Sequence, residues 1–126
     1  MAGGDNPLLA YGGWLAGTPD AWPEKALTAA HNAFTDTIGV TIPGAAEPVT
    51  RKVFATMRPW GEGPCAAIGF DVRLAAPWAA LVNGTAAHAL DFDDNFDPAK
   101  AHASAVLVPA ILALAEQEGA SGRSCP

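Results

Sequence analysis

The feature that most limits how this chain folds is an uncharged apolar stretch near its C-terminal end, ASAVLVPAILALA, at residues 103–115. A helix that spans a bilayer needs about 20 such residues, so this stretch is too short for one. Its length and composition are instead typical of a helix buried in a protein core. Gly119 suits the stop position, and we expect the helix to run from about Ala103 to Glu118.

Apolar residues recur at helical spacing through most of the remaining chain, which predicts a mainly helical protein. Pro23 suits a helix start, with the helix continuing to Gly39, and Pro48 and Pro77 open two further helices. Between the last two, a Gly- and Pro-rich segment predicts a small β-hairpin. The expected elements are helices at about 6–16, 23–39 and 48–57, strands at 65–68 and 72–74, and helices at 77–90 and 103–118. We expect the four tryptophans to pack in the core.

Composition and charge exclude several functions. A chain of 126 residues forms at most one domain, and 50% hydrophobic against 16% charged residues predicts a folded core. A net charge of −6 argues against a nucleic-acid partner. The N-terminus lacks the basic start of a secretory signal, so we expect a cytoplasmic protein with no membrane partner. Cys65 and Cys125 have neither metal-ligand nor CxxC spacing, which favours a reducing compartment.

An acidic stretch, HALDFDDNFDPAKAH, lies directly before the apolar helix. Its four aspartates are Asp91, Asp93, Asp94 and Asp97. Because like charges this close repel one another, such a cluster is either a well-solvated turn or a site that uses the carboxylates. Three kinds of site fit the sequence: a calcium loop, a magnesium site and an acid–base site.

The two metal interpretations each lack an essential feature. Asp91, Asp93 and Asn95 match positions 1, 3 and 5 of an EF-hand calcium loop. Phe96 and His102, however, occupy the positions that need glycine and glutamate. DDNFD at residues 93–97 fits the DDxxD pattern with which all-helical isoprenoid synthases hold Mg²⁺ and a diphosphate. That motif lies within a long helix, whereas Pro98 ends any helix here, so it remains a minor alternative.

The acid–base interpretation centres on His102, which stands at the start of the apolar helix. Its imidazole can take or give a proton near neutral pH. Asp91 lies three residues after His88, so the two share a face if the preceding helix reaches that far. The alternative is a solvated turn in which the histidine only caps the helix.

The acidic stretch belongs to a longer pattern, AAPWAALVNGTAAHALDFDDNFDPAKAHASAVLVPAILALAEQEGASGR. This pattern closely resembles the N-terminal region of the MmgE/PrpD family, which includes 2-methylcitrate dehydratase and cis-aconitate decarboxylase. The resemblance extends upstream through GPCAAIGFDVRLAAP and AFTDTIGVTIPGA, and it covers the chain from about Leu8 to Arg123. The joint match of NGTAAHALDFDD and AHASAVLVPAILALAE makes it specific.

The resemblance implies both an architecture and a reaction class. Family members have a large all-helical domain and a smaller α+β lid, with the active site between them and dimers formed through the helical domain. They act on small polycarboxylates, by dehydration, decarboxylation or epimerisation next to a carboxylate, and use neither a metal nor another cofactor. We therefore expect a lyase or isomerase of the 2-methylcitrate dehydratase type that binds a small polycarboxylate and forms a homodimer.

The family's site residues map onto a few positions of this sequence. Asp91 and His102 match catalytic positions, and we expect His102 to transfer the proton while Asp91 orients it or relays a proton. Asn95 stands where relatives commonly carry threonine, and with Lys100 it is expected to contact substrate oxygens. Residue 103 is often proline in the family and is alanine here.

The chain differs from the family in its extent. Relatives continue for hundreds of residues after the GASGR motif, with the lid and further basic site residues, whereas this sequence ends at Pro126. We therefore expect residues 1–126 to form part of the helical domain, without the lid, and to require a complementing C-terminal chain for activity. The alternative is a catalytically inactive helical remnant, or a module that only self-associates through exposed apolar faces.

Overall fold

The computed structural model describes residues 6–18 and 21–121. Within them the chain forms five α-helices, two short 3-10 helices and one two-stranded hairpin. The elements in order are α1 (Pro7–Gly17), α2 (Glu24–Gly44), α3 (Pro48–Met57), η1 (Arg58–Trp60), β1 (Glu62–Ala66), β2 (Arg73–Leu74), α4 (Ala76–His88), η2 (Asp97–Ala99) and α5 (Ala103–Glu118). The predicted mainly helical fold with one β-hairpin is confirmed.

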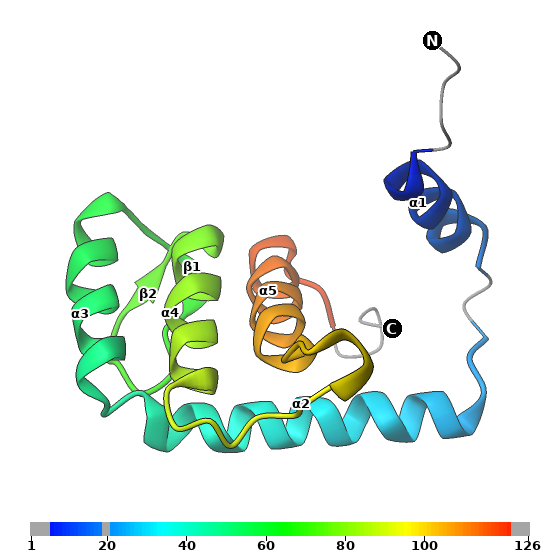
Figure 1. Cartoon of the computed structure of the whole chain (residues 1–126). Coiled ribbons are helices and arrows are strands. Elements are labelled where there is room, and N and C mark those ends of the chain that lie inside the picture. Colours follow the sequence, from blue (N-terminus) through cyan, green and yellow to red (C-terminus); the bar gives the residue numbers. More distant parts are fainter. Residues whose placement is uncertain (1–5, 19–20, 122–126) are drawn as a thin grey trace, which may run out of the picture.

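Helix α4 is the centre of the fold. It lies between α3 and α5, and both α4 and α5 pack on the long helix α2 (Figure 1). Because neighbours contact α4 on several sides, its core positions carry small side chains, and Ala79, Ala86 and Ala87 are completely buried. Small side chains let helix axes approach closely, so the alanine-rich sequence of α4 is explained by its central position.

Two glycines allow helices to approach α4 at backbone distance. A Cβ atom at Gly44, in the last turn of α2, would lie 1.9 Å from the carbonyl oxygen of Ala86. A Cβ at Gly84 of α4 would lie 3.0 Å from the carbonyl oxygen of Ala105 in α5. Both glycines therefore serve close helix packing.

The hairpin is fastened to α4 by one buried amide. β1 and β2 pair antiparallel, and the Asn83 side chain faces the end of β1 and the turn that follows it. Its Oδ1 accepts from the backbone N–H of Ile68 at 2.8 Å, and its Nδ2 donates to the carbonyl of Ala66 at 2.9 Å. Because Asn83 is only 4% exposed, these bonds satisfy an amide that would otherwise be costly to bury.

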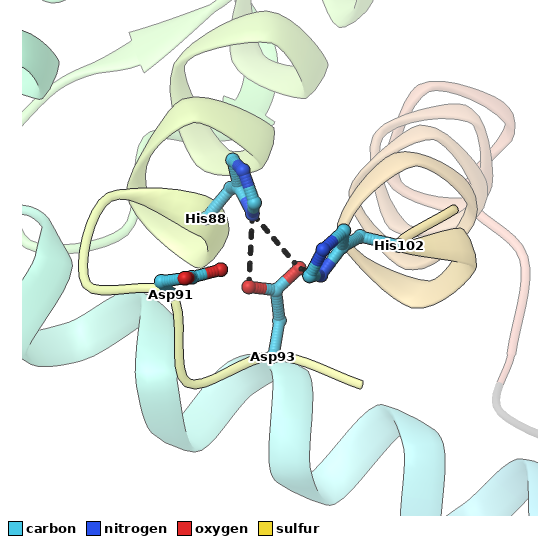
Figure 2. A group of neighbouring side chains, drawn as sticks. All are labelled: His88, Asp91, Asp93 and His102. Carbon is cyan, nitrogen blue, oxygen red and sulfur yellow. Dashed lines mark hydrogen bonds and ion pairs between the residues drawn. The ribbon is translucent and has the colours of Figure 1, made fainter. Parts of the chain in front are cut away.

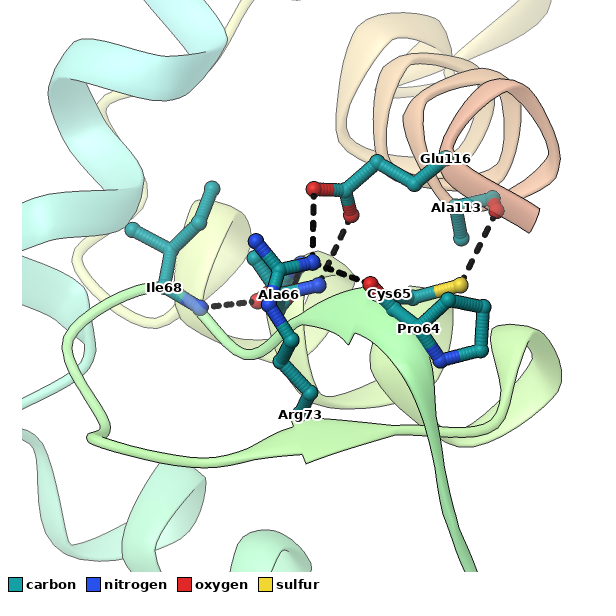
Figure 3. Close-up of polar contacts among 8 residues, drawn as sticks. Pro64, Cys65, Ala66, Ile68, Arg73, Ala113 and Glu116 are labelled. Atoms are coloured by element: carbon teal, nitrogen blue, oxygen red, sulfur yellow. Dashed lines mark hydrogen bonds and ion pairs between the residues drawn. The ribbon is translucent and has the colours of Figure 1, made fainter. Parts of the chain in front are cut away.

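Polar contacts also join the hairpin to α5 (Figure 3). The thiol of Cys65 donates to the carbonyl of Ala113 at 3.1 Å, and Glu116 accepts from the Ala66 N–H at 2.7 Å and pairs with Arg73 at 3.5 Å. Burial raises the pKa of the Cys65 thiol, and the Glu116 carboxylate raises it further, while Arg73 opposes them. The thiol therefore stays protonated as a structural donor.

The sequence-based expectations for the end of α2 and for the tryptophans were wrong. Helix α2 continues to Gly44 instead of ending at Gly39. A glycine in a helix costs only about 1 kcal/mol, and the extension buries Thr41 and brings Gly44 against α4. Trp14 and Trp60 are also more than half exposed, so the tryptophans are not all core residues.

Large apolar side chains remain at the surface of the described residues. Helix α1 lies apart from the other helices in Figure 1 and buries none of its residues. On α5, Val106, Leu107 and Leu114 are more than half exposed. Among the described residues, no helix has the length and apolarity needed to cross a membrane.

Candidate functional site

Four side chains from the acidic stretch and its flanking helices converge where α4 and α5 meet. His88 is the last residue of α4, His102 is the N-cap of α5, and Asp91 and Asp93 come from the loop between them. One ligand atom from each lies within 4.8 Å of all the others. We call these four residues the histidine–aspartate cluster.

Asp93 is the centre of this cluster. Its side chain is completely buried and points up between the two imidazole rings (Figure 2). The Nδ1 atom of His88 lies 3.0 Å from Oδ1 and 3.2 Å from Oδ2 of Asp93, and the Nδ1 atom of His102 lies 3.1 Å from Oδ2. Only the His88 contact is aligned as a hydrogen bond, so the buried Nδ1 of His102 has no hydrogen-bond partner.

The backbone of the loop explains how a short segment reaches both helices. Asp91 and Lys100 adopt left-handed conformations, with φ of 55° and 49°, which reverse the chain on either side of the acidic residues. A bridge between Phe96 and Ala101 closes the loop. Asp94 accepts from the backbone N–H of Ser104 at 3.0 Å and so caps the first turn of α5.

The close packing of α4 on α5 brings the two histidines together. Gly84 lies one helical turn before His88 and faces the backbone of Ala105, in the first turn of α5. Because the helices touch here, the ring centroids of His88 and His102 are 4.6 Å apart, in an edge-to-face arrangement. The distance between the imidazoles is thus fixed by helix packing as well as by the loop.

A groove of about 850 Å³ runs along α4 and α5 to the two histidines. Its walls come from these helices, with Val49 at the start of α3. Thr85, His88 and His102 supply its polar groups, and the rest of the lining is apolar. No Lys or Arg of the described residues lines it. The groove can therefore hold apolar atoms against two imidazoles, but its own walls offer no fixed positive charge to an anion.

The structure brings together some of the residues expected from sequence and separates others. Asp91 and His102 lie in the cluster. Lys100 forms an exposed ion pair with Asp97 in η2, and Asn95 is exposed in the loop, so neither reaches the groove. The catalytic and binding roles given to these residues stay predictions.

From the sequence, His88 was considered only as a neighbour of Asp91, and Asp93 only as a metal ligand; neither was predicted to contact His102. The prediction that His88 and Asp91 share a helix face required the helix to continue to about Leu90, but α4 ends at His88. The chain turns there, and Asp93, five residues on, faces the His88 ring instead. The one sequence signal for this contact was a histidine on either side of an acidic loop.

The aspartates of the DDxxD-like sequence do not converge on a common point. Asp93 contacts the histidines, Asp94 caps α5, and Asp97 pairs with Lys100. Residues 89–96 form no helix, so they lack the single helical face from which that motif holds Mg²⁺. This geometry does not support the magnesium–diphosphate alternative.

Comparison with known proteins identifies the same family that the acidic stretch and its flanking segments resemble. Residues 14–125 match the model of the MmgE/PrpD N-terminal domain. Human cis-aconitate decarboxylase is 50% identical over 46 residues, which are 36% of this chain and 9% of that protein. The mouse cis-aconitate decarboxylase is 35% identical over 83 residues, covering 64% of this chain and 17% of the relative.

A cis-aconitate decarboxylase-like protein of Aspergillus oryzae is 29% identical over 106 residues, covering 83% of this chain and 22% of the relative. The chain thus spans less than a quarter of the length of each of these relatives. No solved structure gives a significant match. Because the family model covers most of its length, the chain belongs to the MmgE/PrpD family, to whose N-terminal domain residues 14–125 correspond.

Proposed function

We propose that this chain supplies the proton-transferring part of an MmgE/PrpD-type active site that acts on a small polycarboxylate. The reaction we favour is dehydration of the 2-methylcitrate type, in which a proton leaves the carbon next to a carboxylate and a hydroxyl departs as water. His102 is the proton-transfer group, and Asp91 orients it or relays the proton. Family membership and the position of His102 in the groove support this assignment.

The observation that carries the proposal is the pair of imidazoles around one buried carboxylate at the end of a groove. A carboxylate that faces Nδ1 favours the proton on that nitrogen and leaves Nε2 as the basic atom. Asp93 faces Nδ1 of His88 in this way, and its Oδ2 lies 3.1 Å from Nδ1 of His102 without an aligned hydrogen bond. The pair of imidazoles provides one group to accept a proton and a second to donate one, as a dehydration requires.

The groove and the histidine–aspartate cluster lack the positive charge that a polycarboxylate needs. A polycarboxylate carries several negative charges, and the cluster itself contains two aspartates. Binding therefore needs cationic groups beyond the walls of the groove. Lys100 is one candidate, if substrate displaces Asp97 from it. We infer that the other cations come from a C-terminal segment of the family, either in a complementing chain or in the second subunit of a homodimer.

The test is complementation. The chain is co-expressed with the C-terminal segment of a family member from which the part corresponding to residues 14–125 has been removed. The purified complex is assayed for dehydration of 2-methylcitrate and for decarboxylation of cis-aconitate. We expect turnover of one substrate, and a loss of about 100-fold or more in kcat for His102→Ala, because general acid–base catalysis contributes at least that much.

His31 provides a matched control, because it is exposed on α2 and away from the groove. His31→Ala should leave the rate of the complex unchanged. The proposal is wrong if a stable complex converts neither substrate, or if His102→Ala in an active complex is as fast as wild type.

A purely structural role is the second candidate, and the exposed apolar residues of α1 and α5 favour it. Such surfaces are typical of contacts with another protein or another copy. In that case the chain would associate without any catalytic contribution. Complementation separates the two functions, because a structural module gives a complex whose activity does not depend on His102.

A further inference from the structure

We propose that His88, Asp93 and His102 form a binding site for a divalent transition-metal ion of the Zn²⁺ class, with Asp91 as a fourth ligand. The inference rests on the geometry of the histidine–aspartate cluster and not on the proposed catalytic function. The family resemblance implies a reaction that needs no metal. An ion bound to His102 and Asp91 would occupy the groups that the proposed function uses for proton transfer, so the metal-bound form would not turn over substrate.

The spacing of the donor atoms fits a common metal centre. Zn²⁺ bonds of about 2.0–2.1 Å to nitrogen and oxygen in a tetrahedral site place neighbouring ligand atoms about 3.3 Å apart. Nδ1 of His88 and Nδ1 of His102 lie 3.0 Å and 3.1 Å from the nearest carboxylate oxygens of Asp93. Small outward movements of these side chains therefore open a site of the required size.

The contact between His102 and Asp93 is a second observation that points to a ligand. The two groups are 3.1 Å apart, yet the buried Nδ1 of His102 makes no hydrogen bond. A nitrogen that is withdrawn from water usually has a partner. An ion between the two side chains would give Nδ1 that partner and would also balance the completely buried carboxylate of Asp93.

The donor set selects the class of ion. Two imidazoles with carboxylate oxygens suit Zn²⁺, Co²⁺, Ni²⁺ and Fe²⁺, whereas Mg²⁺ and Ca²⁺ prefer sites made only of oxygen. Asp91 completes the set from the exposed side, where His88 is also half exposed (Figure 2). The ion can therefore enter from solvent without any opening of the core.

The ligands also come from three separate parts of the fold. His88 ends α4, His102 begins α5, and both aspartates belong to the loop between them. A bound ion would join these parts, so metal binding should raise the thermal unfolding temperature of the protein. This readout does not involve substrate and is independent of catalysis.

The experiment uses the full 126-residue chain, first treated with a chelator and then titrated with Zn²⁺ by calorimetry. Co²⁺ serves as a spectroscopic probe, because its ligand-field absorption reports the number and type of ligands. We expect one ion per chain, a nitrogen- and oxygen-ligated Co²⁺ spectrum and a higher unfolding temperature. Mg²⁺ at the same concentration should give none of these changes.

Variants locate the site. His88→Ala, Asp93→Asn and His102→Ala should each weaken Zn²⁺ binding by about tenfold or more, because each removes a ligand. His31→Ala and Cys125→Ser control for binding to the remaining histidine and to a thiol. Circular dichroism confirms that each variant is folded.

Two results would overturn the proposal: wild-type protein that shows no ligand-field absorption under a large excess of Co²⁺, or folded His88→Ala and His102→Ala variants that bind as tightly as wild type. Neither result bears on the proposed acid–base function. Conversely, complementation without turnover would leave the metal site intact.

Discussion

At the scale of single residues, the site depends on one carboxylate that is surrounded by protein. Asp93 has acidic residues close by on either side in the sequence, Asp91 and Asp94, yet its side chain is completely buried between two imidazoles. Its neighbour Asp94, in contrast, is exposed and serves to cap α5. The two adjacent aspartates thus have separate tasks, which explains why an acidic stretch can lie against the most apolar helix of the chain.

A second residue-scale feature, the buried thiol of Cys65, predicts a dependence of stability on pH. Burial raises its pKa above the ordinary value of 9.0 in the folded protein, and Glu116 adds to this effect. The unfolded chain releases the thiol proton near pH 9.0, but the folded chain does so only at higher pH. The stabilising effect is therefore fully present below pH 9.0 and is lost as the pH rises through the folded-state pKa.

This effect is measured by urea unfolding between neutral and alkaline pH. The difference in unfolding free energy between wild type and Cys65→Ala should shrink as the pH rises above about 9, since only the wild type loses this contribution. Cys125→Ala is the control and should follow the wild-type curve. A constant difference between wild type and Cys65→Ala across that range would contradict the prediction.

At the scale of elements, backbone contacts between helices determine where the site forms. Gly44 brings α2 onto α4, and Gly84 brings α4 onto α5. The second contact lies one turn from His88 and sets the separation of the imidazoles. The position of the histidines is therefore a property of the helix packing, and the loop completes it by supplying Asp93.

The α2–α4 contact predicts opposite effects for two glycine substitutions in the same helix. Gly44→Ala places a methyl group 1.9 Å from the Ala86 carbonyl oxygen and should destabilise the protein by about 1–3 kcal/mol or more. Gly39→Ala meets no atom within 4 Å and should stabilise it by up to about 1 kcal/mol. Chemical denaturation of both variants measures the difference, and equal effects would show that the contact is not tight.

Elements were more predictable from the sequence than the contacts between them. The positions of proline and glycine predicted α3 and the presence of the hairpin. The uncharged apolar stretch predicted the bounds of α5, from Ala103 to Glu118. The full length of α2 was missed because the gain that outweighs Gly39 comes from packing on α4, which is far away in sequence. Asp93 was missed for a related reason, since its partners are defined only once α4 ends at His88.

At the scale of the whole molecule, the main feature is apolar surface without a partner among the described residues. Helix α1 is exposed along its whole length, and α5 presents Val106, Leu107 and Leu114 to solvent. Exposing such apolar faces to water is unfavourable, so they favour association with another protein surface. They agree with the proposal that this chain works together with a second chain or with another copy of itself.

The α5 surface predicts a change in association on substitution. Leu107→Ser with Leu114→Ser removes two large side chains that are more than half exposed and about two helical turns apart on one face. We expect this double variant to be folded and to associate at least about tenfold more weakly with itself or with the complementing chain, because it loses several kcal/mol of apolar burial. Light scattering and analytical ultracentrifugation measure the change.

Leu27→Ser in α2 is the control, because Leu27 is exposed to a similar degree but lies on another helix. It should leave association unchanged. If the α5 double variant associates as strongly as wild type, the interface lies elsewhere, and α1 becomes the next surface to test.

The order of the cluster residues along the chain has a practical consequence. All of them lie between His88 and His102, within one continuous peptide that is closed by its own bridge from Phe96 to Ala101. The cluster could therefore be transferred as one continuous segment onto another helical hairpin that has a small residue where its two helices cross.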